Sequence, residues 1–314
     1  MTVSRSRGEN RPSREAFATR RVTVPVDGSD AECAATLYLP ADADDPPAVV
    51  MAPPFAAEAS FGLPRFAERF AAAGYAALTV DYRGIGRSAS GRDAASARDA
   101  PAVIPDRQCD DVAAAADFAA GHDDVGDDLV LWGASLAGGY AVSVAADRYD
   151  VDAVVAQTPI PDGGLLGGGD SLRSRLRAAA AGLRDRIGGL VGRPHHVKVY
   201  GDPDEFAVLN APGAKDGYVR LIPRESTWQN RTPARGLSAL RGYRAVADAD
   251  AVRCPAFVVA AADDAVVPAE STEAFVDALA DPTVLRRPMN HFDAFHDDFE
   301  AIVRHQLAFL DATL

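Results

Sequence analysis

The stretch LVLWGASLAGGYAV, residues 129–142, decides the fold of this 314-residue chain. It begins with a short apolar run, as a buried strand does, and a helical pattern starts directly after Ser135. Gly133 and Ala137 flank the serine at two residues on either side, where so sharp a turn leaves room only for small side chains. The stretch therefore predicts a nucleophile elbow, with Ser135 projecting above the strand end at a helix N-terminus that favours negative charge.

The alternative is an ordinary strand–helix turn that happens to carry a serine. Other G-x-S triplets occur at Ser88, Ser171 and Ser238. None of these three follows an apolar strand and leads directly into a helix, so Ser135 is the candidate nucleophile.

Strand and helix patterns alternate on both sides of the elbow. We expect strands at 22–26, 34–39, 48–53, 76–82, 128–133, 152–157, 255–261 and 283–288, and helices at 63–75, 110–120, 136–146, 268–280 and 297–312. The first two strands form a β-hairpin. This order predicts an α/β fold with a mostly parallel central sheet flanked by helices.

The middle of the chain breaks this rhythm. Residues 160–249 are rich in glycine and helical stretches and contain no strong apolar strand. We expect them to form a helical cap, or lid, inserted between the sixth and seventh strands. The core then comprises residues 21–159 and 250–314, and residues 1–20 are expected to be a mobile tail.

A nucleophilic serine needs a general base and an acid that orients it. Of six histidines, four fall in a polar loop, the insertion or the last helix: His122, His195, His196 and His305. His291 and His296 remain, and His291 follows the final strand through a short loop that can bring it back to the sheet. Asp264 follows the preceding strand, with Asp263 as the alternative acid. The order Ser135, Asp264, His291 is that of the elbow-type hydrolases.

Metal and phosphate sites are weaker interpretations. His291, Asp293, His296 and Asp297 form an H-x-D-x-x-H-D pattern, but an acidic helix start accounts for it better. Neither lysine lies in a Walker A loop, and no G-x-G-x-x-G follows a strand. We therefore expect no metal and no cofactor.

Four motifs together resemble the α/β-hydrolase superfamily over residues 21–314. They are WGASLAGG at the elbow, DYRGIGRS at 81–88, D-x-x-V-P at 264–268 and Asn290-His291-Phe292. Within the superfamily the chain is most similar to the dienelactone-hydrolase-like, serine-aminopeptidase-like and X-Pro-peptidase-like branch. The resemblance implies Ser135 as nucleophile, Asp264 as acid and His291 as base.

The resemblance also implies an oxyanion hole. In this fold one donor is the N–H after the nucleophile, that of Leu136, and the other comes from the loop after the strand at 48–53. That loop reads Pro53-Pro54-Phe55-Ala56 instead of His-Gly. Since proline has no N–H, the family register assigns the second donor to Phe55, which could also be only a wall of the acyl pocket.

Near the DYRGIGRS turn, Asp81 and Arg83 are expected to brace the loop at the site through hydrogen bonds and an ion pair. This interpretation gives both residues a structural role near the site.

The charge composition is skewed toward aspartate and arginine. There are 35 Asp, 10 Glu, 30 Arg and 2 Lys, with a net charge of −13. This acidity disfavours a nucleic-acid binder. An aspartate-rich surface with few lysines resembles those of halophilic proteins, although codon bias in a GC-rich genome would produce a similar composition.

Cysteines and apolar segments bear on the compartment. Cys33, Cys109 and Cys254 are odd in number and far apart, so we expect buried or half-buried thiols and no disulfide framework. No segment has the length of an apolar membrane span, and the polar start does not resemble a secretory signal. These features favour a cytoplasmic location.

Inside the insertion, apolar residues including Leu176 and Leu183 recur at helical spacing, and arginines occupy the other face. Glycines flank the segment, as they do the hinges of a lid. The lid hypothesis lets Leu176 and Leu183 contact the acyl chain of a substrate, while simple packing against the core is the alternative.

These features favour a serine hydrolase that cleaves a carboxylic ester or related acyl bond of a small molecule. A peptidase and a thioester acyltransferase use the same residues. A non-catalytic binding module on the same scaffold is the third possibility.

Overall fold

The computed structural model describes residues 16–90, 102–166 and 172–314. An eight-stranded sheet has the order β1-β2-β4-β3-β5-β6-β10-β11. Its strands are β1 (Phe17–Pro25), β2 (Glu32–Pro40), β3 (Ala48–Ala52), β4 (Ala76–Val80), β5 (Leu129–Ala134), β6 (Ala153–Gln157), β10 (Ala256–Ala261) and β11 (Pro282–Arg287). β1 and β2 run antiparallel to their neighbours, and the other pairs are parallel. The predicted α/β fold is confirmed.

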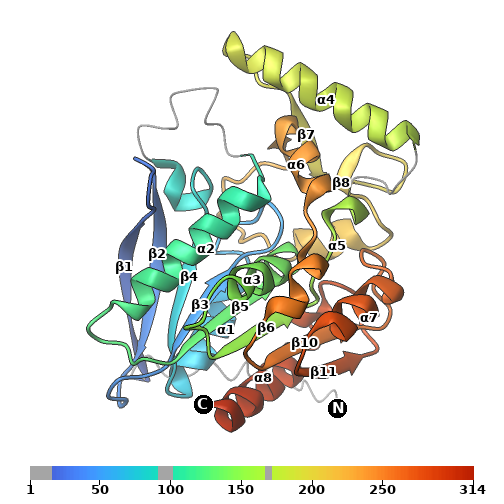
Figure 1. Ribbon diagram of the computed structural model, residues 1–314. Coiled ribbons are helices and arrows are strands. Elements are labelled where there is room, and N and C mark those ends of the chain that lie inside the picture. The colour runs from blue at the N-terminus through green and yellow to red at the C-terminus, as the bar shows by residue number, and fades with distance from the viewer. Residues whose placement is uncertain (1–15, 91–101, 167–171) are drawn as a thin grey trace, which may run out of the picture.

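Helices cover both faces of this sheet (Figure 1). They are α1 (Leu63–Ala72), α2 (Pro105–Ala120), α3 (Leu136–Ala146), α7 (Ala269–Ala278) and α8 (Phe299–Thr313). α1 packs beside α8, where the rings of Phe66 and Phe299 lie 4.6 Å apart, and α2 packs beside α3. Strands β3 to β6 are buried along their whole length because helices cover both of their sides.

The predicted N-terminal tail is too long. Strand β1 begins at Phe17 and pairs with β2 over its full length, so residues 17–20 belong to the sheet. β1 is an edge strand with most of its side chains exposed, which makes FATRR look like a polar tail in sequence. Residues 1–15 of the expected tail lie outside the described residues.

The insertion lies between β6 and β10, the sixth and seventh strands of the large sheet, as expected. It is not purely helical: β7 (His196–Tyr200), β8 (Ala207–Leu209) and β9 (Thr232–Pro233) form a second sheet. These strands are too short, and β7 too polar on alternate residues, to be recognised from apolar runs. The α-helices of the insertion are α4 (Leu172–Leu190), α5 (Ala214–Val219) and α6 (Leu237–Gly242).

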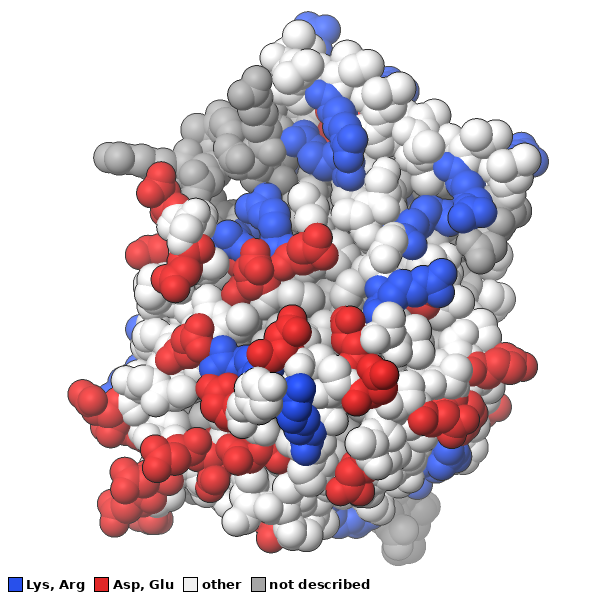
Figure 2. Space-filling model, viewed as in Figure 1, with Lys and Arg blue, Asp and Glu red and all other residues white. Residues whose placement is uncertain are grey.

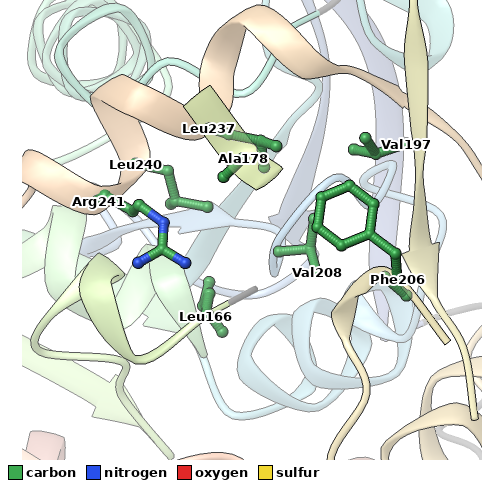
Figure 3. Close-up of a pocket in the computed structure, with 9 residues that line it drawn as sticks. Leu166, Ala178, Val197, Phe206, Val208, Leu237, Leu240 and Arg241 are labelled. Carbon is green, nitrogen blue, oxygen red and sulfur yellow. The ribbon is translucent and has the colours of Figure 1, made fainter. Parts of the chain in front are cut away.

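The cap has an apolar interior of its own (Figure 3). Ala178 of α4, Val197 of β7, Phe206, and Leu237 and Leu240 of α6 surround a cavity of about 10 Å³. A space of this size holds at most a single water. The interior of the cap is therefore closely packed, and α4 contributes only small side chains to it.

A buried ion pair fastens α4 to the rest of the cap. Asp185 has no exposed surface and accepts hydrogen bonds from Arg235 Nε at 2.7 Å, Arg235 N at 2.9 Å and His195 N at 2.7 Å. Burial opposes ionisation of this carboxyl, but the hydrogen bonds from Arg235 and His195 hold its pKa below the usual value. Asp185 therefore stabilises the fold in its ionised form.

We expect Asp185→Ala to lower the free energy of unfolding by about 3 kcal/mol, because the ion pair with the half-buried Arg235 and the hydrogen bonds from two backbone N–H groups to the buried carboxylate are lost. Since the folded-state pKa of Asp185 is lowered, its contribution is present above the pKa of the unfolded chain and is lost as pH falls through the folded pKa. Urea unfolding at neutral and acidic pH measures both effects. Asp277→Ala, at an exposed site on α7, is the control, and an equal loss in both variants would contradict the prediction.

All three cysteines are free thiols, as predicted. Cys33 is buried, and Cys109 and Cys254 are half-buried. Burial raises the pKa of each thiol, that of Cys254 to about 11. The thiols are therefore protonated and poor nucleophiles at neutral pH.

Among the described helices, none has the length and apolar character needed to cross a bilayer.

Candidate active site

Ser135 occupies a strained turn between β5 and α3. Its backbone has φ 58° and ψ −123°, a conformation that side chains disfavour. The turn is so tight that a Cβ on Gly133 would lie 1.9 Å from the carbonyl oxygen of Ala137. Gly133 is thus required by the backbone, and the geometry is that of the predicted elbow.

Three side chains from separate loops are linked in series by hydrogen bonds. Ser135 Oγ lies 2.9 Å from His291 Nε2, and His291 Nδ1 lies 2.7 Å from Asp264 Oδ2. Ser135 is 2% exposed and His291 1% exposed. With the proton on Nδ1, the imidazole donates to the carboxylate and accepts from the serine hydroxyl. The structure therefore brings together the three residues selected from the sequence.

Asp264 has two structural tasks. Its Oδ1 accepts hydrogen bonds from Val266 N at 2.7 Å and Val267 N at 2.9 Å, which closes the loop ahead of α7, while Oδ2 contacts His291. Burial would raise its pKa, but His291 and the two backbone N–H groups lower the pKa below the usual carboxyl value. Asp263, the alternative acid, is exposed.

The N–H groups predicted to form an oxyanion hole belong to two buried residues that follow paired strands. Leu136 follows Ser135 directly, and Phe55 lies in the loop after β3, the strand that pairs with β5. Phe55 is 2% exposed and Leu136 fully buried, and neither N–H donates to an acceptor within the described parts of the chain. Since buried N–H groups are nearly always paired, these two are available to bind an oxygen anion.

The cap holds the loop that carries Phe55. Tyr218 Oη of α5 donates to the carbonyl oxygen of Phe55 at 2.8 Å, and Trp228 Nε1 donates to that of Ala56 at 3.0 Å. Ala56 has φ 53°, a conformation that needs support from its surroundings. No sequence motif marks Tyr218 and Trp228; their one signal is that they are large aromatic residues within a polar insertion.

Asp81 supports the loop that carries Phe55. Its carboxylate is buried, accepts a hydrogen bond from Ala59 N at 2.7 Å and pairs with Arg87. Burial raises the pKa of Asp81, and the hydrogen bonds from Ala59 and Arg87 oppose this rise. The bracing role predicted for Asp81 matches these contacts. Arg83 forms its ion pair with Asp111 of α2 and not with Asp81.

The histidine–aspartate pattern after β11 has ordinary structural contacts. His296 Nε2 lies 3.3 Å from the carbonyl oxygen of Gly217, and Asp293 accepts a hydrogen bond from Asn290 N at 2.8 Å. Within the described residues no group of three or more His, Cys, Asp or Glu side chains is arranged to hold a metal ion.

The structure does not place Leu176 and Leu183 at the serine. Both side chains are about 60% exposed on the outer side of α4. The opposite side of α4, with Ala178, Ala181 and Gly182, packs against the cap instead, because only small residues allow that close approach. The cap segment next to the site is α5: a Cβ on Gly217 would lie 2.6 Å from the ring of Phe292, the neighbour of His291.

The order of the central sheet and the helices on both of its faces are those of an α/β-hydrolase. A family model described as X-Pro dipeptidyl-peptidase (S15 family) matches residues 27–293. The chain belongs to this family.

One known protein is similar in sequence, and solved structures share the fold. The quorum-quenching protein AidA of Acinetobacter baumannii is 30% identical over 292 residues, covering 91% of this chain and 93% of its own. The α/β hydrolase GrgF from Penicillium sp. superposes with a TM-score of 0.80 at 21% identity, covering 94% of this chain and 99% of its own. Est1E of Butyrivibrio proteoclasticus reaches 0.59 at 18% identity, covering 93% and 98%.

Proposed function

We propose that the protein is a serine hydrolase that cleaves a carboxylic ester, or a related acyl bond, of a small molecule. The observation that carries this proposal is the hydrogen-bonded chain Ser135–His291–Asp264 at a strained elbow. Ser135 Oγ attacks the carbonyl carbon while His291 Nε2 accepts its proton. Asp264 holds the imidazole and stabilises its charged form.

The tetrahedral intermediate carries its negative charge on the former carbonyl oxygen. The N–H groups of Leu136 and Phe55 donate to that oxygen. His291 then protonates the leaving alcohol, and an acyl-enzyme remains on Ser135. A water molecule that loses its proton to His291 attacks this ester, releases the acid and restores the serine.

An apolar acyl group fits the surroundings of the site. The ring of Phe292 lies 4.9 Å from that of His291, and Tyr218 and Phe61 continue an aromatic cluster toward the loop of Phe55. A relative is described as quorum-quenching, which fits the destruction of a small signal molecule. These features support an ester or lactone as the substrate. The family description supports a peptidase as the second candidate.

A substrate panel separates the candidates. It compares p-nitrophenyl esters of increasing acyl length, a lactone, an acyl thioester and an aminoacyl-prolyl anilide. We expect kcat/KM to be highest for one of the oxygen esters. A higher kcat/KM for the anilide would assign a peptidase, and transfer of the thioester's acyl group to an added amine or alcohol would assign an acyltransferase.

Tyr218 is proposed as a positioning residue for the oxyanion hole. We expect Tyr218→Phe to lower kcat about 10- to 100-fold with little change in KM, because the Phe55 carbonyl loses its hydrogen bond and its peptide is no longer held. Tyr200→Phe is the control, since Tyr200 stacks on Trp228 in the same cluster. Equal kcat values for the two variants, or a change confined to KM, would exclude the positioning role.

The acidic composition supports a further proposal, that the protein is adapted to high salt. We expect the melting temperature to rise between about 0.1 and 2 M KCl, as salt screens the repulsion among carboxylates. Thermal melts at several KCl concentrations measure this effect. An unchanged or lower melting temperature would favour codon bias as the origin of the composition.

A further inference from the structure

Helix α4 carries an apolar stripe on the outside of the cap. The stripe consists of Leu172, Leu176, Leu183, Ile187 and Leu190, which are between 58% and 72% exposed. At 100° per residue these side chains fall on one side of the helix, opposite the side that packs on the cap. So long a row of exposed leucines marks an interaction surface.

Arginines border the stripe on both sides. Arg173, Arg177 and Arg184 lie along one border, and Arg175 and Arg186 along the other. The only acidic residue of α4 is Asp185, which is buried against Arg235. Among the described residues, none of the five border arginines forms an ion pair with a carboxylate. The exposed side of α4 is therefore apolar along its middle and carries arginines at both borders. On one border the guanidinium of Arg177 lies over the ring of Phe206, and Asp204 and Glu205 line the same hollow, so Arg175 and Arg186 form the more purely cationic border.

This cationic helix stands out from the rest of the molecule. The chain has a net charge of −13. On the face shown in Figure 2, acidic side chains gather over the end away from the cap, and basic ones over the end that carries the cap. Charge thus orients the molecule with α4 toward an anionic partner and its acidic end away from it.

We propose that α4 docks the protein on an anionic lipid surface. The stripe enters the boundary between headgroups and acyl chains, and the arginines on both borders contact lipid phosphates. Exposed leucines between rows of arginine are the pattern of helices that lie in a membrane interface. Arginine suits it because its stem follows apolar surface while its guanidinium reaches the phosphate. The proposal is independent of the hydrolase function.

Two features favour lipid over a protein partner. If two copies paired through their stripes, arginine rows would lie beside arginine rows in either orientation, because both borders are basic. In addition, α4 lies at the outer edge of the molecule (Figure 1). A bilayer can contact a helix at such an edge along its whole length. The distant acidic end is screened, since in about 0.15 M salt the Debye length is about 8 Å.

Flotation of the full chain with vesicles tests the proposal. One vesicle preparation contains equal parts phosphatidylglycerol and phosphatidylcholine, and the other phosphatidylcholine alone, both in about 0.15 M KCl. We expect at least about tenfold more protein bound to the anionic vesicles. Leu172→Ser with Ile187→Ser should abolish this binding, and Arg175→Gln with Arg186→Gln should weaken it severalfold.

Two matched controls use exposed residues away from α4. Tyr149→Ser, at a side chain that is 84% exposed, removes an apolar group, and Arg304→Gln removes a charge from α8. Both should float like the unchanged protein, and thermal melts should show all variants folded. Equal flotation with both vesicles, or none, overturns the proposal. A dimer in sedimentation that the Leu172/Ile187 variant abolishes would assign the stripe to a second copy instead.

Discussion

Replacing Ser135 by alanine is expected to lower kcat by roughly four to six orders of magnitude, because no other group can form the acyl-enzyme. KM should change little, since the methyl group fits wherever the hydroxyl did. Covalent labelling by a fluorophosphonate probe should disappear. Steady-state kinetics on the best ester of the panel and probe labelling followed by mass spectrometry measure these two effects.

Ser238→Ala is the matched control for this experiment. Ser238 also lies in a G-x-S triplet, but its side chain is exposed and it begins no elbow. The control should keep full activity and full labelling. Labelling that persists in the Ser135→Ala variant would place the nucleophile elsewhere, and full activity of that variant would exclude the proposed mechanism.

Asp264→Asn is expected to lower kcat by about four orders of magnitude. An amide donates where the carboxylate accepts, so His291 would be held with the proton on the wrong nitrogen and could not accept the serine proton. Oδ1 can still accept from Val266 and Val267, so the loop should keep its shape. The measurement is kcat over a range of pH, with a thermal melt to show that the variant is folded.

The neighbouring Asp263 supplies the control, because Asp263→Asn removes a carboxylate one residue away. Its kcat should stay within about twofold of the unchanged protein, as is usual for an exposed site outside the chemistry. A large loss of kcat in Asp263→Asn with little loss of kcat in Asp264→Asn would assign Asp263 as the acid that orients His291. Because the pKa of Asp264 is lowered, it stays ionised in mildly acidic solution, so loss of activity there would not arise from its protonation.

The elbow could be predicted from the sequence because its constraints are local. A buried strand, a serine and small residues within five positions leave one backbone path, and the Cβ clash at Gly133 shows how little room that path has. Asp264 and His291 were also accessible. Each follows a strand of a parallel sheet, and the ends of such strands meet at one edge. No local pattern, however, could set the distances between the three side chains.

The position of the cap in the chain could be predicted from the sequence, but its secondary structure could not. Its strands are two to five residues long and pair within a small separate sheet, so they lack the apolar runs of the large sheet. The hydrogen bonds from Tyr218 and Trp228 to the loop of Phe55 connect residues more than 160 positions apart. Nothing in the local sequence of either segment specifies that pairing.

By itself, the sequence determined the elbow, the α/β alternation and the three residues that meet at the sheet edge, because strand, turn and helix preferences act over a few neighbouring residues. Only the tertiary structure decided which side of α4 faces inward. The helix has both a leucine stripe and a side of small residues, and hydrophobicity alone would bury the leucines. The cap backbone approaches too closely for that: a Cβ on Gly182 would lie 3.3 Å from the carbonyl oxygen of Ala234, so the small residues face inward and the leucines remain outside.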